Sequence, residues 1–281
     1  KIILFIFVLL LLFAGFKFTR FKLNDDFMIS NIYGKLQHEE SWQQEPPANL
    51  NALLNQPFYY LGKGCQSYVF GSQDGKYVIK FLKHQHLRNG WWWKMLPLPT
   101  SLSNKLAYKR KQKQEIFNSI ASASLIAANE LKQETGVIYA HMDLSTGFPT
   151  IQITDLLNNF YEVDLNQVEF IVQKRVLPAL TLLQELAQKE DHKGFQEMMT
   201  KILKLLAHRF EKGFYDNDRA TLQNVGFTEE GKAVIVDTGK LDKGAHGDYK
   251  PMLRRRLVQI RKQIHAEFPI FQQDIDYQFQ V

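Results

Sequence analysis

Two polar side chains, Asn224 and Asp237, have the types and the positions to bind one metal ion together. Asn224 lies ahead of a turn, and Asp237 ends the apolar run Ala233–Val236. Amide and carboxylate oxygens are ligands that Mg²⁺ takes where it also contacts the phosphate oxygens of a nucleotide. If neighbouring strands bring the two residues to one point, the pair predicts phosphoryl transfer.

A second set of candidate phosphate-binding residues lies upstream, in Leu61-Gly-Lys-Gly-Cys-Gln-Ser-Tyr-Val69. An Asp74-Gly75 turn separates this stretch from Tyr77-Val-Ile-Lys80. Asp-Gly between two runs of β-branched and aromatic residues is a strong hairpin signal, so the glycines and Lys80 should lie on adjacent antiparallel strands. In such a hairpin the glycines let the backbone approach phosphate oxygens, and the lysine reaches these oxygens from the strand behind.

These elements, in this order along the chain, resemble those of the protein-kinase-like superfamily: a glycine-rich loop, a Val-x-Lys strand, a catalytic-loop asparagine and a metal-binding Asp-x-Gly. The resemblance implies an α+β, two-lobed protein-kinase-like fold, with an antiparallel sheet in the N-terminal lobe and a short helical C-terminal lobe. It also implies ATP and Mg²⁺ as cofactors. The function that it implies is an ATP- and Mg²⁺-dependent phosphotransferase.

The resemblance also assigns roles to residues of the N-terminal lobe. Lys80 would hold the α- and β-phosphates, and Glu115, on a helix expected between Asn104 and Thr135, would orient Lys80. Glu130 and Glu134 lie on the same helix, and a surface carboxylate beside lysines is the alternative for any of the three. The residues expected to contact the nucleotide are Gly62, Gly64, Ser67, Val69, Lys80, Glu115 and, at the hinge beside the adenine, Gln173.

The catalytic loop departs from the pattern of the superfamily. Arg219 occupies the position where the family has its catalytic base. One inserted residue would let Asp218 accept the proton of the substrate hydroxyl, with Asp216 as the second candidate. The alternative is that both are turn-forming aspartates between a helix and a strand. Thr238 replaces the phenylalanine of Asp-Phe-Gly, which leaves the metal role of Asp237 intact.

The chain beyond Gly239 is short and contains no Ala-Pro-Glu sequence. Protein kinases use that region for an activation segment and for docking peptides, so a small molecule, lipid or sugar is expected as acceptor rather than a peptide. Its helix, Met252 to His265, carries Arg254–Arg256, which suits either phosphate groups or a solvated helix face. The alternative function is a catalytically inactive pseudokinase that acts as a membrane-tethered interaction module, for which a protein partner is expected.

The amino-acid composition excludes several other classes of protein. The 281 residues, 45% of them hydrophobic, suffice for one two-lobed domain with an extension, and 35 basic against 29 acidic residues give a net charge of +6. The single cysteine, Cys65, excludes an intramolecular disulfide and a four-thiolate metal site. There is no His-Glu-x-x-His, no serine-hydrolase elbow and no nucleic-acid module, so a nucleic-acid partner is not expected.

The N-terminal run from Ile2 to Phe16 is apolar throughout and is followed by basic residues. As a helix it would extend about 22 Å, short of the roughly 30 Å hydrocarbon core unless Phe18 and Phe21 prolong it. Residues 1–22 are expected to be a single-pass anchor with the domain in the cytoplasm, or alternatively a signal segment of a secreted protein. Residues 23–56 read as a linker or extension, and 57–281 as the kinase-like domain, with lobes of about 57–175 and 176–281.

A basic and aromatic stretch, Lys83 to Lys94, follows the lysine strand and contains Trp91–Trp93. Indoles beside lysines suit a membrane interface, where the rings lie at headgroup depth. An insertion whose rings pack on the N-terminal lobe is the alternative. The expected partners are therefore a nucleotide and a membrane, the latter through the N-terminal helix and Trp91–Trp93.

Overall fold

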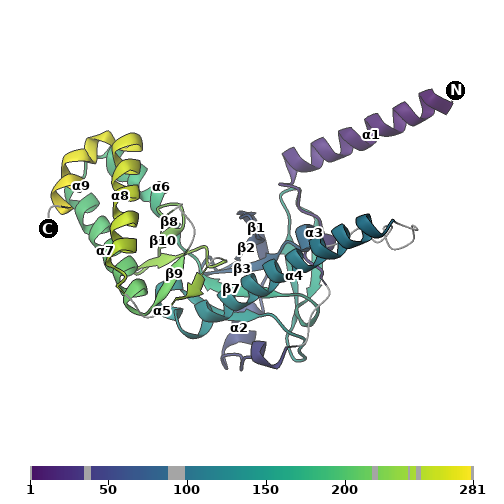
Figure 1. The fold of residues 1–281 in the computed structure, drawn as a ribbon, viewed down its shortest axis with the longest axis horizontal. Helices are drawn as coiled ribbons and strands as arrows, with labels where there is room; N and C mark the ends of the chain where they lie inside the picture. The colour runs from purple at the N-terminus through teal and green to yellow at the C-terminus, as the bar shows by residue number, and fades with distance from the viewer. Residues whose placement is uncertain are drawn as a thin grey trace. The chain divides into compact units, whose positions relative to one another are not determined.

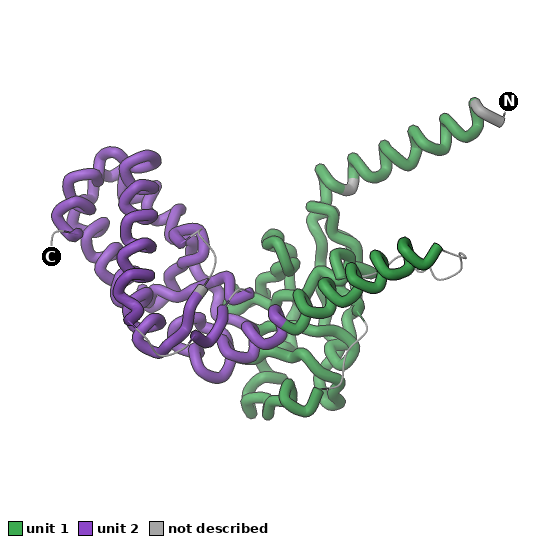
Figure 2. Tube along the Cα trace, viewed as in Figure 1, with its two compact units in different colours: residues 1–118, 139–172 green, residues 119–138, 173–281 purple. Residues whose placement is uncertain are grey.

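The computed structural model of the chain describes residues 2–34, 39–87, 99–216, 221–239, 241–244 and 248–279 (Figure 1). It has an α+β fold with two compact units (Figure 2). Unit 1 comprises Lys1–Asn118 and Tyr139–Val172, and unit 2 comprises Ser119–Ile138 and Gln173–Val281. Trp91–Trp93 and Asp218 lie outside the described residues, so the predictions made for them stay predictions.

Unit 1 is built on a seven-stranded sheet of order β4-β7-β3-β2-β1-β5-β6. Its strands are β1 (Phe58–Lys63), β2 (Ser67–Ser72), β3 (Tyr77–Leu82), β4 (Val137–His141), β5 (Thr150–Thr154), β6 (Phe160–Asp164) and β7 (Phe170–Lys174). The antiparallel expectation holds for β1–β2, β2–β3 and β5–β6, but β1 and β5 run parallel, so the sheet is mixed. Aromatic side chains that alternate along these strands, such as Tyr68 and Phe70, are fully buried and form the core of the sheet.

The helices of unit 1 are α1 (Ile2–Leu23), η1 (Ile29–Asn31), η2 (Glu40–Trp42), α2 (Leu50–Leu54), α3 (His84–Leu87), α4 (Thr100–Asn129) and η4 (Leu165–Gln167). The last part of α4 belongs to unit 2. The helix expected to reach Thr135 is divided, since α4 ends at Asn129 and α5 (Lys132–Thr135) follows. Gly136 ends α5 in the left-handed conformation, with φ at 66°, as a glycine stop requires.

The described residues between α1 and β1, 24–34 and 39–57, include side chains that are buried within unit 1. Phe27 is buried and contacts the rings of Tyr68 and Phe70, with ring centroids 5.1 and 5.4 Å apart. Leu50 and Leu54, from α2, are also buried. These burials are those of an extension that packs on the sheet, and the domain boundary near residue 57 stays a prediction.

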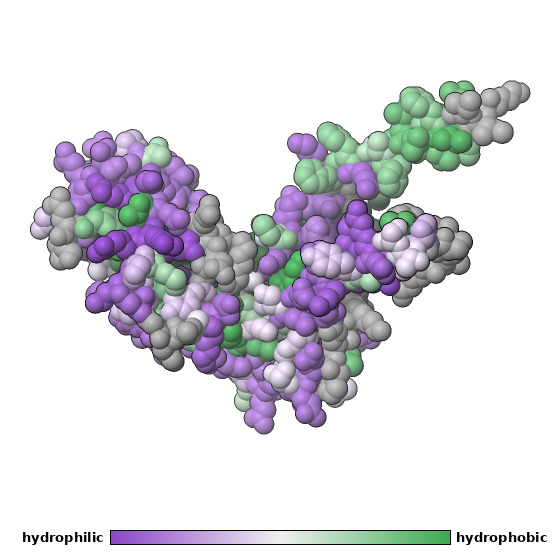
Figure 3. Space-filling model, viewed as in Figure 1, coloured by the Kyte–Doolittle hydropathy of each residue, from purple (hydrophilic) through white to green (hydrophobic). Residues whose placement is uncertain are grey.

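The N-terminal helix α1 is longer than the apolar run that predicts it, because it continues through the basic residues to Leu23. Within it, Leu4–Leu23 has 20 residues, a mean hydropathy of 2.0 and no residue buried inside the protein. Figure 3 shows the hydrophobic surface of α1. By length and composition α1 is sufficient to cross a membrane, a criterion that signal sequences also meet.

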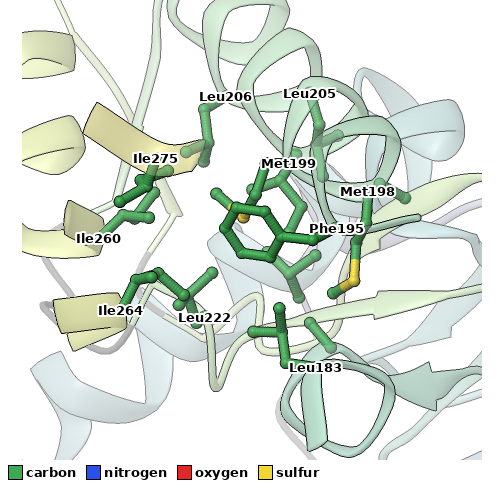
Figure 4. Packing of buried hydrophobic residues seen from close by; sticks show 14 of the residues in the cluster. Leu183, Phe195, Met198, Met199, Leu205, Leu206, Leu222, Ile260, Ile264 and Ile275 are labelled. Carbon is green, nitrogen blue, oxygen red and sulfur yellow. The ribbon is translucent and has the colours of Figure 1, made fainter. Parts of the chain in front are cut away.

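Unit 2 is mainly helical, with α5, α6 (Ala179–Gln188), α7 (His192–Glu211), α8 (Lys250–Glu267), η5 (Pro269–Phe271) and α9 (Gln272–Gln278). Its strands are β8 (Leu177–Pro178), β9 (Phe214–Asp216), β10 (Val225–Phe227), β11 (Ala233–Ile235) and β12 (Leu241–Lys243). They form a three-stranded sheet of order β11-β10-β8 and a β12-β9 pair. The helices surround one apolar cluster that includes Phe195, Val225 and Ile235 (Figure 4).

A buried carboxylate, Asp155, joins the chain after α1 to the turn between β5 and β6. Its oxygens accept hydrogen bonds from Asn24, Asn159 and Tyr161 at 2.9 to 3.2 Å. Burial by itself would raise the pKa of Asp155, but these hydrogen bonds hold the pKa below its ordinary value of 3.8. Its stabilisation is therefore present above that pH and is lost as the pH falls through the lower, folded-state pKa.

We predict that Asp155→Asn lowers the free energy of unfolding by about 1–3 kcal/mol at neutral pH, because one amide oxygen cannot replace two carboxylate oxygens as acceptors. The difference between wild type and variant should shrink in acid, where wild-type Asp155 also becomes protonated. Urea unfolding of the full chain in detergent, at neutral pH and at about pH 2, measures both. A difference that is the same at both pH values would contradict the assignment.

Candidate functional site

Asn224 and Asp237 both lie at the open end of one β-hairpin. Asn224 directly precedes β10, and Asp237 lies just after β11; the two strands pair antiparallel with Val225 opposite Ile235. The pairing continues one step further, since the Val236 N–H donates to the Asn224 carbonyl at 2.8 Å. Asn224 is therefore opposite Val236, and Asp237 is one residue further along the other strand. Both predicted metal ligands belong to this end of the hairpin, and their convergence on one ion stays a prediction.

The surroundings of this pair suit a surface site that faces a ligand. Asp237 is exposed, and its Oδ1 accepts a hydrogen bond from the Gly239 N–H at 3.1 Å, which orients the carboxylate. Asn224 is half-buried, and Thr238, where the superfamily has phenylalanine, is buried. A carboxylate and an amide oxygen are hard donors that fit Mg²⁺. Among the described residues no three His, Cys, Asp or Glu side chains gather.

A second pair of strands fixes the chain on both sides of this site. β9 pairs antiparallel with β12, with Asp216 opposite Leu241. β9 leads into the predicted catalytic loop, and β12 begins shortly after Asp237. The backbone of Asp216 is thus placed, whereas its side chain is not described. The assignment of a base to Asp218 or Asp216 stays a prediction.

The hairpin of the site depends on a close approach between β8 and β10. Gly226 lies opposite Pro178 in this pairing, and a Cβ at Gly226 would collide with the side chain of Val176 and lie 3.0 Å from the Leu177 carbonyl. Only glycine therefore allows the β8 backbone to pair here. The requirement for glycine arises from a contact distant in sequence, so the amino-acid pattern does not reveal it.

Gln173, predicted to lie at the hinge beside the adenine, ties the site to the rest of unit 2. Its side chain is buried, and Nε2 donates to the Thr135 carbonyl at 2.6 Å and to the Ile235 carbonyl at 3.2 Å. Ile235 is the last residue of β11, two positions before Asp237. The amide thus holds β11 against the end of α5, a role that the sequence does not indicate. A contact between its backbone and a nucleotide stays a prediction.

In unit 1 the predicted phosphate-binding residues lie in one row across three strands. Gly62 on β1 is opposite Val69 on β2, and Val69 is opposite Lys80 on β3. Residues directly opposite each other on antiparallel strands present their side chains on the same face, so Val69 and Lys80 share one face of the hairpin. Ser67 begins β2, and the Gly64 N–H donates to the Ser67 carbonyl at 2.9 Å. This hydrogen bond closes the turn between β1 and β2, residues 62–67, which we call the glycine turn.

The two glycines of this turn are not required by the protein's own packing. Neither Gly62 nor Gly64 has a left-handed φ, and a Cβ built on either would meet nothing within 4 Å. Gly75, in the turn between β2 and β3, differs because its φ of 74° favours glycine. Gly62 and Gly64 therefore leave open space beside the backbone of the turn.

A residue that the sequence reasoning did not single out, Lys83, fixes the glycine turn from β3. Its backbone N–H donates to the Gln66 carbonyl at 2.8 Å, and its Nζ donates to the Gly64 carbonyl. The ammonium also lies over the ring of Tyr68, 4.8 Å from the centroid. Burial, followed by the nearby Lys63, lowers the pKa of Lys83. The only signal in the sequence was its position just after the lysine strand.

The predicted partner of Lys80, Glu115, lies on an exposed face of α4. Its side chain is 62% exposed and pairs with Lys111 at 3.9 Å. Glu115 thus lies where a surface carboxylate paired with a neighbouring lysine would lie, and its contact with Lys80 stays a prediction. The other two carboxylates pair within unit 2: Glu130 with Lys243 at 2.8 Å, and Glu134 with Lys212 at 2.7 Å.

Comparison with known proteins yields a weak structural likeness. No protein-family model and no curated protein matches the chain. Among solved structures, the chain is similar to a crystal structure of WbdD at 12% identity and a TM-score of 0.38, over 83% of this chain and 39% of WbdD. A second WbdD structure, described as a bifunctional kinase-methyltransferase, has 12% identity and a TM-score of 0.37 over 83% of this chain and 40% of WbdD.

A co-crystal structure of WbdD with the kinase inhibitor LY294002 is similar at 14% identity and a TM-score of 0.36, over 75% of this chain and 38% of WbdD. The chain thus spans well under half the length of these proteins. Similarity at this level places no activity on this chain.

Proposed function

We propose that the chain binds ATP with Mg²⁺ and is a kinase-like phosphotransferase. The observation that carries the proposal is the β10–β11 hairpin, in which the Val236-to-Asn224 hydrogen bond brings an amide and a carboxylate to one end of two paired strands. Phosphoryl transfer to a hydroxyl group uses this pair of oxygen ligands to hold the metal that bridges the phosphates.

The glycine hairpin of unit 1 supports the same proposal independently. Gly62 and Gly64 are required neither by φ nor by crowding, so their lack of side chains leaves the turn open to a ligand. Lys80, two strands away in the same row, presents its side chain on the face that it shares with Val69. An open glycine turn beside a strand lysine is suited to bind phosphate oxygens.

In the proposed reaction each residue has a limited task. Lys80 binds the α- and β-phosphate oxygens, and Asn224 and Asp237 hold Mg²⁺, which when bound neutralises charge on the β- and γ-phosphates. Asp218, with Asp216 as the second candidate, accepts the proton of the acceptor hydroxyl, whose oxygen bonds to the γ-phosphorus as the bond to the ADP oxygen breaks. Positioning and charge neutralisation provide most of the rate gain, and the base adds about 10²–10⁴-fold.

The acceptor and the location of the protein belong to the proposal as well. The acceptor is proposed to be a small molecule, lipid or sugar rather than a peptide. The exposed apolar helix α1 is proposed to be a single-pass anchor, with Lys17, Arg20 and Lys22 on the cytoplasmic side. Cleavage of residues 1–22 during export would instead support the secreted alternative.

Replacement of Lys80 tests the nucleotide site. We expect Mg²⁺ and ATP to raise the melting temperature of the full chain in detergent, and Lys80→Met to weaken ATP binding by about tenfold or more, because a hydrogen bond to a charged group contributes about 1.5–3 kcal/mol. Lys76→Met, an exposed lysine in the turn between β2 and β3, is the matched control and should bind like wild type. Equal affinity of Lys80→Met and wild type would argue against the phosphate role.

The pseudokinase alternative is favoured by one specific observation, the exposed position of Glu115 beside Lys111. It predicts a nucleotide-dependent melting shift without hydrolysis or transfer of the γ-phosphate. Measuring release of labelled phosphate from the same samples decides between the two functions. The absence of a melting-temperature shift at millimolar ATP would contradict both functions, because each requires the chain to bind nucleotide.

A further inference from the structure

The chain makes a tight left-handed turn where it leaves α1. Asp25 and Asp26, two successive residues other than glycine, have φ of 48° and 61°. Aspartate is among the residues that tolerate this region, yet such conformations persist only where the surrounding structure holds them. The contacts that hold these two residues therefore show what the turn is attached to.

Asp25 is attached to the glycine turn. Lys63 Nζ donates to the Asp25 carbonyl at 2.8 Å and lies 3.5 Å from its Oδ1. The Tyr60 hydroxyl donates to Asp25 Oδ2 at 3.3 Å. Lys63 Nζ also lies over the ring of Phe21, 4.8 Å from the centroid, and Phe21 is in the last turn of α1. One ammonium thus joins the end of the apolar helix and the turn after it.

Asp26 is attached to the neighbouring strand of the same hairpin. The Tyr68 hydroxyl donates to the Asp26 carbonyl at 3.1 Å, and Asn31 Nδ2 donates to the same carbonyl at 3.3 Å. Tyr68 is fully buried in β2. The exit of α1 is therefore bound both to β1, which carries Lys63, and to β2.

The position of Lys63 makes this attachment relevant to the nucleotide. Lys63 lies between Gly62 and Gly64 at the end of β1. Glycines on both sides give the backbone conformational freedom that must be lost when a phosphate binds. Lys83 limits that freedom by binding the Gly64 carbonyl from β3, and the contacts of Lys63 with Asp25 and Phe21 limit it at the other end of the turn.

We propose that Asp25, Phe21 and Lys63 form a positioning contact that holds the glycine turn in its nucleotide-binding shape and links it to the apolar helix α1. This inference rests on the proposed ATP binding. Lys63 and Asp25 act on the turn through its backbone, so they are positioning residues. The side chains of Lys63 and Asp25 are 28% and 41% exposed, so solvent weakens their interaction. We therefore expect loss of this contact to weaken ATP binding about fivefold, at the small end of measured coupling energies.

The test is a double-mutant cycle on the full chain in phosphatidylcholine vesicles, with Mg²⁺ and ATP as the probe. Lys63→Met should weaken ATP binding about fivefold. Asp25→Asn should weaken it less, because it removes the carboxylate charge but keeps the carbonyl that accepts the hydrogen bond from Lys63. The double variant should be no weaker than Lys63→Met, because the contact of Asp25 with the turn requires Lys63. Lys63→Arg should restore binding to within about twofold of wild type. If the chain turns ATP over, KM for ATP should rise and kcat should stay constant.

Two controls separate this contact from general effects. Phe21→Ala should weaken ATP binding about twofold to threefold, since it removes a cation–π contact, whereas Phe18→Ala, a similarly exposed ring of α1, should not. Lys76→Met removes an equal charge at the other end of the hairpin and should bind ATP like wild type.

The outcomes distinguish this inference from the proposed function. A wild-type chain that does not respond to Mg²⁺ and ATP overturns the proposed function, and the positioning contact with it. A responsive wild type with unchanged binding in Lys63→Met and Asp25→Asn overturns the positioning contact alone. Additive losses in the double variant also overturn it, because independent losses show that the two residues do not act through one contact.

Discussion

Asp237→Ala is expected to abolish the stabilisation of the chain by Mg²⁺ and ATP. A ligand at one hundred times its dissociation constant stabilises a protein by about 2.7 kcal/mol, and a variant whose affinity falls about a hundredfold or more loses most of that. The large loss is expected because a carboxylate next to a divalent ion and two phosphates is the strongest local charge that the chain supplies. Thermal unfolding of the full chain in detergent, with and without Mg²⁺ and ATP, measures the effect.

The same substitution should leave the unliganded protein nearly unchanged. Asp237 is exposed and accepts one described hydrogen bond, from Gly239, so its removal should alter the free energy of unfolding by less than about 0.5 kcal/mol. Asp242→Ala, at an exposed aspartate of β12, is the matched control and should keep the full response to ATP. An undiminished metal-dependent response in Asp237→Ala would refute the metal assignment.

Phe195→Ala should produce the largest loss of stability, about 3–5 kcal/mol, because it removes a fully buried aromatic ring and leaves a cavity. Phe195 stacks on Phe271, with centroids 4.2 Å apart and ring planes 13° apart. The same apolar cluster includes Val225 and Ile235 of the site hairpin (Figure 4). The loss should therefore also weaken Mg²⁺-dependent ATP binding. Urea unfolding followed by circular dichroism measures the stability.

Tyr277→Ala provides the control for Phe195→Ala, because Tyr277 is an aromatic residue of unit 2 with 69% of its surface exposed. Its replacement should change the free energy of unfolding by less than about 0.5 kcal/mol. A loss below about 1 kcal/mol for Phe195→Ala would show that the ring does not support the core in the way the structure indicates.

Local patterns in the sequence were sufficient to predict one hairpin and one further strand. Asp74-Gly75 between two β-prone runs predicts β2 and β3, and the structure pairs them with Val69 opposite Lys80. The apolar run that ends at Asp237, with Asn224 upstream, likewise corresponds to β11 and the residue before β10. Such predictions succeed because turn chemistry and strand alternation act over a few neighbouring residues.

Choices among residues on one helix required the structure. Composition and the glycine at 136 indicate a helix, yet they do not tell which of Glu115, Glu130 and Glu134 faces which partner. The structure gives each of them a different lysine. Helical periodicity places residues on faces, but tertiary packing decides what each face contacts.

Patterns of neighbouring residues predicted the β2–β3 hairpin and the apolar N-terminal helix, whereas the resemblance to the kinase-like superfamily implied the α+β class. The folded structure was needed to show that Phe27, Leu50 and Leu54 are buried and that β1 runs parallel to β5. It was also needed to show that Gln173 holds β11 in unit 2 and that Lys83 holds the glycine turn in unit 1. Each of these features depends on contacts between residues that are distant in sequence or on how a side chain packs in the folded protein. A pattern of neighbouring residues carries no information about such partners until the chain is folded.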